Sequence, residues 1–205
     1  KSSLVERLKN LMEHEPIYAL ADADGNVSPI QESPLGVCGT EILESNGIKV
    51  KNLVIPSPWA TKRLQEYAGD LSKFKVVKTH TCQLKQLAIS KVEPGDENNQ
   101  DISALVGKVD IRKLEHYAQN DPDAYSYSGG LCLSNQGVLE FVEMFKAPIK
   151  MLHPLLTATQ EKNYKGTEAL SAIPFQGIVI AHSNESEWDT FKANKNNEAF
   201  LDRVY

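Results

Sequence analysis

The clearest structural signal in this sequence is the stretch Gly137-Val138-Leu139-Glu140-Phe141-Val142-Glu143. Its apolar residues run directly to an acidic residue, which is the pattern of a buried strand in an α/β sheet. A second run, Phe175-Gln176-Gly177-Ile178-Val179-Ile180-Ala181-His182, ends in Ser183-Asn184. The two runs predict buried parallel strands with polar residues at their carboxyl ends, which is where open α/β sheets bind their ligands.

The first residues predict an amphipathic helix over 3–14. Apolar residues recur there at helical spacing, and Lys9 falls on the opposite, polar face. A short apolar strand follows over 17–20 and ends in a turn rich in Asp, Gly and Asn. Weaker patterns predict a helix over 40–45 within an irregular stretch (27–58), a helix over 59–67, a strand over 74–77, a helix over 82–91, a polar loop over 93–101 and a helix from Met144 to Pro148.

Composition limits the class of protein. The chain is 41% hydrophobic and 24% charged, as is ordinary for a globular domain. Its net charge of -5 provides no basic field for nucleic acid, and no apolar run approaches the roughly 20 residues of a membrane span. The 3 cysteines are widely spaced, which argues against a disulfide framework and a Cys-x-x-Cys metal site. These features predict a soluble, cytoplasmic protein without a nucleic-acid or membrane partner.

A phosphate-binding motif is suggested by Lys1-Ser2, which stands directly before the first predicted helix. In the loop G-x-x-x-x-G-K-[ST] the Lys reaches the terminal phosphates of a nucleotide and the hydroxyl holds Mg²⁺. Without the glycines, a Lys-Ser pair is equally an ordinary chain start. The absence of an initial Met and the abrupt ending at 201–205 predict that the chain is a fragment.

An acidic strand end is the second motif. ATPases with such a loop carry two carboxylates there, one for Mg²⁺ and the next for the attacking water. Glu143 stands at the position of the carboxylate that orients the attacking water. Val142 stands at the position where such ATPases usually carry the Asp that binds Mg²⁺. Glu140 is an alternative for the metal role, although alternation along a strand sends Glu140 and Glu143 to opposite faces. The alternative for each of these two carboxylates is an exposed strand residue without a role in catalysis.

Two further residues complete the candidate site. Asn184 follows the second strand, where an amide either bonds the γ-phosphate or water or simply favours a turn. Arg203 is a candidate arginine finger, which would stabilise the transition state at the nucleotide of a neighbouring subunit. The alternative is an ordinary surface arginine, since most of these form only weak ion pairs. The histidines show no metal-binding spacing, and Ser183 beside His182 lacks an acid that would complete a nucleophilic triad.

Longer stretches of the chain resemble the PrkA serine protein kinase family. One of them is Ala181-His182-Ser183-Asn184-Glu185-Ser186-Glu187-Trp188, and the others cover 93–103, 137–150, 153–161 and 194–203. The resemblance is strongest from Val92 onward and weakest over 28–53. It implies a partial AAA+ domain over residues 1–205. The implied fold is an α/β P-loop NTPase core with a mainly parallel sheet and helices on both faces, truncated at both ends.

The resemblance also implies roles and ligands. Lys1 and Ser2 become the last residues of the phosphate loop, with Mg²⁺ on Ser2, and Asn184 becomes the sensor residue. Val142-Glu143 replaces an Asp-Glu pair, which puts efficient Mg²⁺-dependent hydrolysis in question. The family implies that the protein binds ATP, acts on a protein substrate and forms a homo-oligomer. It also implies a location in the bacterial cytoplasm and a part in the stress response. A lid and a kinase-like region are implied beyond Tyr205.

Two other functions fit the same sequence. A mechanical AAA+ chaperone or protease-associated unfoldase would carry Asn163-Tyr164-Lys165-Gly166 on a hairpin that faces a pore. A scaffold without enzymatic activity would bind ATP without turnover, and Val142 would then mark a decayed ATPase.

Overall fold

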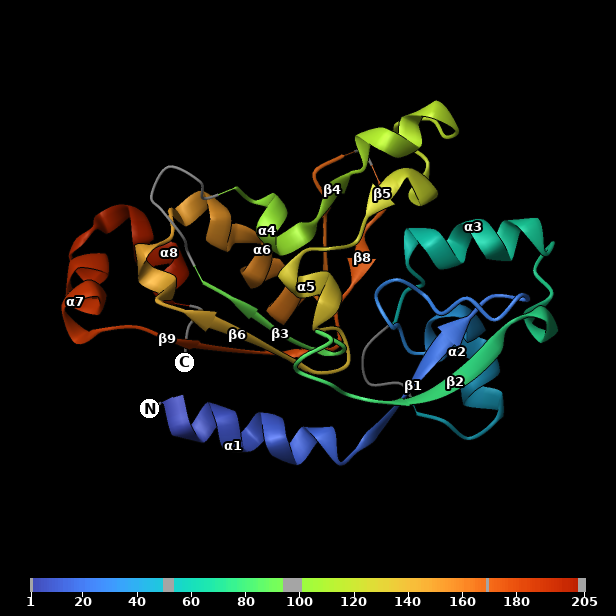
Figure 1. The fold of residues 1–205 in the computed structure, drawn as a ribbon, viewed down its shortest axis with the longest axis horizontal. Helices are drawn as coiled ribbons and strands as arrows, with labels where there is room; N and C mark the ends of the chain where they lie inside the picture. Colours follow the sequence, from blue (N-terminus) through green and yellow to red (C-terminus); the bar gives the residue numbers. More distant parts are fainter. Residues whose placement is uncertain (1, 50–53, 94–100, 169, 203–205) are drawn as a thin grey trace.

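A three-stranded parallel sheet lies at the centre of the molecule (Figure 1). The computed structural model describes residues 2–49, 54–93, 101–168 and 170–202. In the sheet, β6 (Val138–Val142) lies between β3 (Ile89–Val92) and β9 (Ile178–His182). The predicted parallel strands over 137–143 and 175–182 are confirmed, but the second begins only at Ile178. β6 is buried, whereas β9 is an edge strand whose Ile178 is 59% exposed.

Helices cover both faces of this sheet, as predicted. Because side chains alternate along a strand, Leu139 and Phe141 of β6 enter the main core while Glu140 points toward the first helix. That helix, α1, lies on one face, and three helices lie on the other. The four helices are α1 (Ser2–Glu13), α4 (Ser103–Val106), α5 (Gly130–Leu133) and α6 (Ile149–Gln160).

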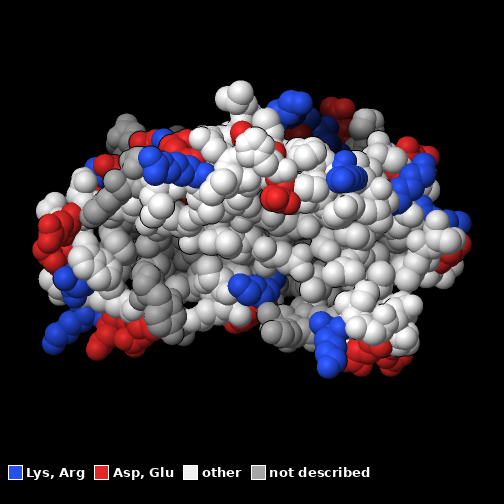
Figure 2. Space-filling model, turned by 90° about the horizontal axis from the view of Figure 1, so that it is seen from below, with Lys and Arg blue, Asp and Glu red and all other residues white. Residues whose placement is uncertain are grey.

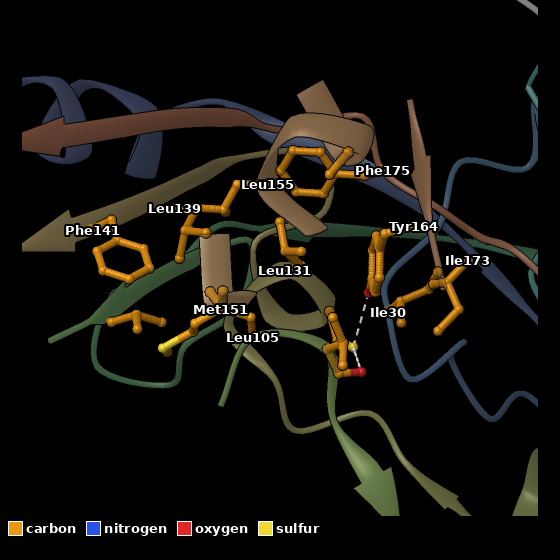
Figure 3. Close-up of a cluster of buried hydrophobic side chains, with 14 of the residues drawn as sticks. Ile30, Leu105, Leu131, Leu139, Phe141, Met151, Leu155, Tyr164, Ile173 and Phe175 are labelled. Atoms are coloured by element: carbon orange, nitrogen blue, oxygen red, sulfur yellow. Dashed lines mark hydrogen bonds between the residues drawn. The ribbon is translucent and has the colours of Figure 1, made fainter. Parts of the chain in front are cut away.

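The main hydrophobic core fills the space between β6 and α6 (Figure 3). Leu139 and Phe141 are completely buried, and Met151 and Leu155 of α6 lie around them. At one end of the core the hydroxyl of Tyr164 lies 3.0 Å from the thiol sulfur of Cys132. Each fully buried Leu or Phe contributes roughly 1.5–3 kcal/mol, so this packing holds β6 in the middle of the domain.

Residues 16–49 and 54–87, which we call the lobe, form a unit beside the sheet. The predicted strands near both of its ends pair with each other in antiparallel fashion, with Pro16 opposite His80. At the start of its second helix, the hydroxyl of Ser57 accepts a hydrogen bond from the backbone of Ala60 at 3.1 Å, which caps that helix. The elements of the lobe are β1 (Pro16–Ala21), α2 (Leu35–Ser45), α3 (Pro58–Glu66), η1 (Leu71–Lys73) and β2 (Lys75–His80).

Two short hairpins extend from the other side of the core. The Tyr125 hydroxyl of the first accepts a hydrogen bond from the backbone of Thr167 in the second at 3.2 Å. The first hairpin is β4 (Lys108–Val109) and β5 (Tyr125–Ser126), with η3 (Ile111–Glu115) and η4 (Pro122–Ala124) between them; the second is β7 (Asn163–Tyr164) and β8 (Ile173–Pro174).

An ionic cluster joins the lobe to the first hairpin. The ammonium of Lys62 contacts Asp121 at 2.8 Å and Asp123 at 2.7 Å, and Arg63 contacts Asp123 at 2.5 Å. The guanidinium of Arg63 also lies over the ring of Trp59. Residues from two regions that are distant in sequence are therefore fixed together by four charged side chains.

Residues 185–201, near the end of the described part, are mostly helical. Phe191 and Phe200 pack edge to face there with their ring centroids 5.6 Å apart, and they close one side of the core. The elements are η5 (Met144–Lys146), which precedes α6, and α7 (Glu185–Ala193), η6 (Lys195–Asn197) and α8 (Glu198–Leu201), which follow β9.

Two predicted helices are wrong. Over 82–91 the chain instead forms a tight turn closed by paired hydrogen bonds between Cys82 and Leu87, and then the strand β3. The apolar spacing there was helical, but pairing with β6 determines the structure. The helix expected from Met144 is a single 3-10 turn, and the long helix α6 begins only after Pro148.

The orientation of α1 also differs from the prediction. Leu4 and Leu11 are 74% and 67% exposed, whereas Val5 and Lys9 are buried. Lys9 therefore lies on the inner face and not on the outer, polar face. On this side of the molecule basic and acidic residues are interspersed with uncharged surface (Figure 2). Over the described ranges, no helix is both long and apolar enough to cross a bilayer.

Candidate functional site

The carboxyl ends of β6 and β9 lie next to each other. Val142 and His182 are opposite one another in the register, and each is the last residue of its strand. Glu143 and Asn184, the two described residues with predicted catalytic roles, therefore leave the same edge of the sheet. The prediction that polar residues follow these strands at one edge is consistent with this register.

Glu143 turns sharply away from its strand. Its backbone is left-handed, with φ 51° and ψ 43°, a conformation that is costly for residues other than glycine. The carboxylate is one-third exposed and forms a 2.8 Å ion pair with Lys146. The site therefore holds its acidic residue at the surface and beside a cation.

A chain of polar contacts links Glu143 to Asn184. Lys146 also contacts Glu187 of α7 at 3.2 Å, and Glu187 accepts a hydrogen bond from the hydroxyl of Ser183 at 2.6 Å. The side-chain amide of Asn184 lies 3.5 Å from the other Glu187 oxygen. The Ser183 hydroxyl and the ammonium of Lys146 lower the pKa of Glu187, and the two carboxylates raise the pKa of Lys146.

The amino end of α1 lies at the same edge. Lys9 of this helix bonds Glu140 of β6. Ser2 is about 10 Å from Lys9 along the helix axis, and Glu143 is about 10 Å from Glu140 along the strand. In Figure 1, α1 begins on the side where β9 leads into α7. The end of α1 that carries the free backbone N–H groups therefore lies on the side of the sheet on which β6 and β9 end.

Glu140 is enclosed rather than exposed. Its carboxylate accepts a hydrogen bond from Lys9 and lies 3.1 Å from Nε2 of His182, and its side chain is 4% exposed. Burial raises the pKa of Glu140, but the bonds from Lys9 and His182 outweigh burial and hold the pKa below its usual value. The reading of Glu140 as an exposed strand residue is wrong, and an Mg²⁺ ion at Glu140 would have to displace Lys9 or His182.

A groove of about 750 Å³ opens beside β9. Val179, Leu155 and Trp188 supply apolar walls, and Ser183 and Asn184 supply polar groups. Ligand pockets combine such walls with a few polar groups, and their volumes are on the order of 300–1,000 Å³. A small organic ligand therefore has space next to the strand ends.

A family model of the PrkA AAA domain matches residues 1–205. The chain belongs to this family. It is 67% identical over 211 residues to the serine/threonine kinase YeaG of Escherichia coli (strain K12), and 34% identical over 215 residues to the ATP-dependent protease PrkA of Bacillus subtilis (strain 168). Both matches cover 100% of this chain and 33% of the relative, so the chain spans a third of the length of these proteins.

A solved structure supports the fold. A chain from the complex between subunits BchI and BchD of magnesium chelatase superposes with a TM-score of 0.50 at 15% identity, covering 88% of this chain and 43% of that one. At this identity the likeness concerns the fold alone. Together with the family match, it identifies the α/β architecture predicted from the sequence as that of an AAA+ domain.

Three predicted residues of this PrkA AAA domain lie partly or wholly outside the described part. Lys1 and Arg203 are outside it, as is the side chain of Ser2, whose backbone begins α1. Within the described ranges no three His, Cys, Asp or Glu residues form a metal-binding group. The Glu143 carboxylate and the Asn184 amide oxygen are nevertheless ligands of the type that Mg²⁺ takes.

Sequence reasoning missed Lys146, Glu187 and Lys9. Lys146 stands three residues after Glu143, a spacing at which charged side chains meet on a helical turn, so its pairing had a local signal. Glu187 had a weaker signal as an acidic residue in the first turn of α7. Lys9 had none, because its partner Glu140 is far away in sequence and the helical pattern assigns a lysine to the surface.

Proposed function

We propose that this chain binds ATP with Mg²⁺ at the carboxyl ends of β6 and β9 and supports its hydrolysis. The observation that carries the proposal is the meeting of three features at one edge: the strand-end carboxylate Glu143, the amide of Asn184 and the amino end of α1. A helix start binds phosphate through its free N–H groups and its dipole. Membership in the PrkA AAA family supports a nucleotide as the anion.

Each site residue has a proposed role in this reaction. The ammonium of Lys1 offsets charge on the β- and γ-phosphates, and the hydroxyl of Ser2 is a ligand for Mg²⁺. The carboxylate of Glu143 orients water for attack on the γ-phosphate. Asn184 donates a hydrogen bond to the γ-phosphate or holds that water, and Arg203 stabilises transition-state charge on a neighbouring subunit.

Magnesium would neutralise phosphate charge as it grows during the transfer. The protein ligands at this edge are few, since Val142 stands in place of the usual Asp and Glu140 is bonded to Lys9. We propose that Mg²⁺ is held by Ser2 together with the phosphates and water, which is the manner in which this ion commonly binds. The 2.8 Å pair between Lys146 and Glu143 has to open before Glu143 can hold water.

In the whole protein we propose that the ATPase serves a cytoplasmic protein serine kinase that acts as a homo-oligomer. The relative at 67% identity is named a serine/threonine kinase, which supports this proposal. Residues 1–205 would be the ATPase domain, while the lid and the phosphate-transferring region would lie elsewhere in the protein.

The test is Glu143→Gln in the full-length protein. The amide keeps the shape of the side chain but cannot act as a base, so we expect ATP affinity within a few-fold of wild type and turnover slower by at least ~10²-fold. Glu44→Gln, on the exposed face of α2, is the matched control. Normal turnover by Glu143→Gln would show that the hydrolytic base lies elsewhere.

A second candidate function is an ATP-driven machine that feeds a protease. The relative at 34% identity is named an ATP-dependent protease, which favours this candidate. Asn163 and Tyr164 do form a strand of a hairpin, but Tyr164 is completely buried in the core and is not exposed toward a pore. Incubating full-length protein with γ-labelled ATP and a protein substrate separates the two. Label on a substrate serine supports the kinase, whereas ATP-dependent cleavage or unfolding of the substrate supports the machine.

A further inference from the structure

A buried charge cluster on the α1 side of the sheet connects three elements. Glu140 of β6 is bonded to Lys9 of α1 and lies 3.1 Å from His182 of β9. The side chains of Lys9, Glu140 and His182 are 1%, 4% and 23% exposed. A second partner of Lys9, Glu6, lies at the half-exposed rim. The cluster is therefore the point at which α1, β6 and β9 are linked by polar bonds.

Stability alone does not account for this cluster. Removing two charges from water costs much of what their attraction returns, and apolar side chains of similar size often stabilise such a position equally well. An ion pair differs from an apolar contact in being directional, because the ammonium and the carboxylate must meet at hydrogen-bond distance. The cluster therefore fixes the position of α1 along β6 more narrowly than apolar packing would.

Each member lies close, along its own element, to a residue of the proposed site. Lys9 is about 10 Å from Ser2 along the helix, and Glu140 is about 10 Å from Glu143 along the strand. His182 ends β9 directly before Ser183 and Asn184. A shift at the cluster is transmitted to the ends of these elements because a helix and a paired strand move as units.

We infer that Lys9, Glu140 and His182 are positioning residues, which lock the amino end of α1 in register with the ends of β6 and β9. The inference rests on the proposed ATPase function and gives none of the three a contact with the nucleotide. Misplacing reacting groups by about 1 Å can slow a reaction ~10²-fold. Loss of the lock therefore lowers kcat more than it weakens ATP binding.

The experiment uses the full-length protein and compares four variants of the cluster with one control variant. Lys9→Met and Glu140→Gln each break the pair, and the double variant K9M/E140L replaces it with apolar side chains. Lys9→Arg keeps the charge. Lys192→Met, which removes the exposed ion pair with Asp189 on α7, is the matched control. Thermal unfolding, ATP binding, kcat and amide hydrogen exchange over residues 2–13 are measured for each.

We expect K9M/E140L to unfold near the wild-type temperature, to bind ATP within a few-fold, and yet to lose kcat by ~10- to 10²-fold. Its α1 should exchange amide hydrogens faster than in wild type, while Lys9→Arg recovers part of kcat. A double variant with wild-type kcat and wild-type exchange would overturn the inference. If wild type itself hydrolyses no ATP, the proposed function fails, and the exchange of α1 still decides whether the lock exists.

Discussion

Glu140 and Glu32 are both buried carboxylates, with 3% and 2% of their surface exposed, but their partners differ in kind. Glu140, in the central sheet, is bonded to the cation Lys9 and to His182. Glu32, in the lobe, accepts hydrogen bonds from Ser28 at 2.6 Å and from the hydroxyl and backbone N–H of Ser57 at 2.6 and 2.8 Å. None of the described ion pairs involves Glu32.

The two surroundings shift the pKa values in opposite directions. Burial raises the pKa of Glu32, and its three neutral donors do not compensate fully. Burial also raises the pKa of Glu140, but Lys9 and His182 reverse the shift and leave the pKa lowered. The sheet that carries the candidate site therefore favours the charged form of its carboxyl group, whereas the lobe disfavours it. In the lobe, the Glu32 carboxyl joins the loop before α2 to the start of α3.

The largest loss of stability is expected for Glu→Gln substitution at Glu140, in the central sheet. Glu140→Gln removes one of the two carboxylates that pair with the buried ammonium of Lys9 in the described part of the chain, and the other, Glu6, is half exposed. Removing one partner of a buried ion pair lowers the free energy of unfolding by about 3–5 kcal/mol. We expect a loss of about 3 kcal/mol here, because Lys9 keeps its bond to Glu6. Urea denaturation of wild type and variant measures the loss. A change below ~1 kcal/mol would mean that water reaches Lys9 readily.

An intermediate effect is expected at the junction of the lobe with the first hairpin. Asp123 contacts Lys62 at 2.7 Å and Arg63 at 2.5 Å, and its side chain is 17% exposed. Asp123→Asn should cost about 1 kcal/mol, because exposed pairs are worth less than that and this one is partly buried. Asp189→Asn removes the highly exposed pair with Lys192 and should change the stability very little. Equal losses in the two variants would argue against a role for the cluster in holding the lobe.

What could be predicted from the sequence depends on whether a feature is a local pattern or a contact between residues far apart in the chain. The strands β6 and β9 and the polar residues after them were recognised because a buried parallel strand is a local pattern. Helices on both faces followed from the resemblance to AAA+ proteins. These features place Glu143 and Asn184 at one edge without any knowledge of long-range contacts.

The features that were missed depend on partners distant in sequence. The helical pattern places Lys9 on the surface because its partner Glu140 lies on another element, and the helical spacing of residues 82–91 conceals β3. The lobe strands were found, but no local signal indicated that β1 pairs with β2. Side chains that bury charge, and strands that pair across long loops, are decided by tertiary contacts rather than by local periodicity.

The smallest effect is expected for Glu32→Gln, the same substitution as at Glu140 but in the lobe. The amide can accept the N–H of Ser57 with its oxygen and donate to the hydroxyls of Ser28 and Ser57 with its nitrogen. No cation is left unpaired among the described contacts, so the free energy of unfolding at neutral pH should change by less than about 1 kcal/mol. A loss as large as that of Glu140→Gln would show that the charge of Glu32 is required.

The pH dependence of these two variants sharpens the comparison further. The raised pKa of Glu32 means that its contribution to stability is complete below its usual value of 4.5 and is lost as pH rises through the folded-state pKa. The lowered pKa of Glu140 means the reverse, a contribution present above 4.5 that is lost as pH falls through the folded-state pKa.

The stability of wild type relative to Glu32→Gln should therefore decrease from pH ~5 to pH ~8. Relative to Glu140→Gln, it should decrease from pH ~5 to pH ~3. Urea denaturation of the three proteins at each pH gives both slopes, and slopes of the same sign would mean that burial, not the identity of the partner, determines how these carboxylates titrate.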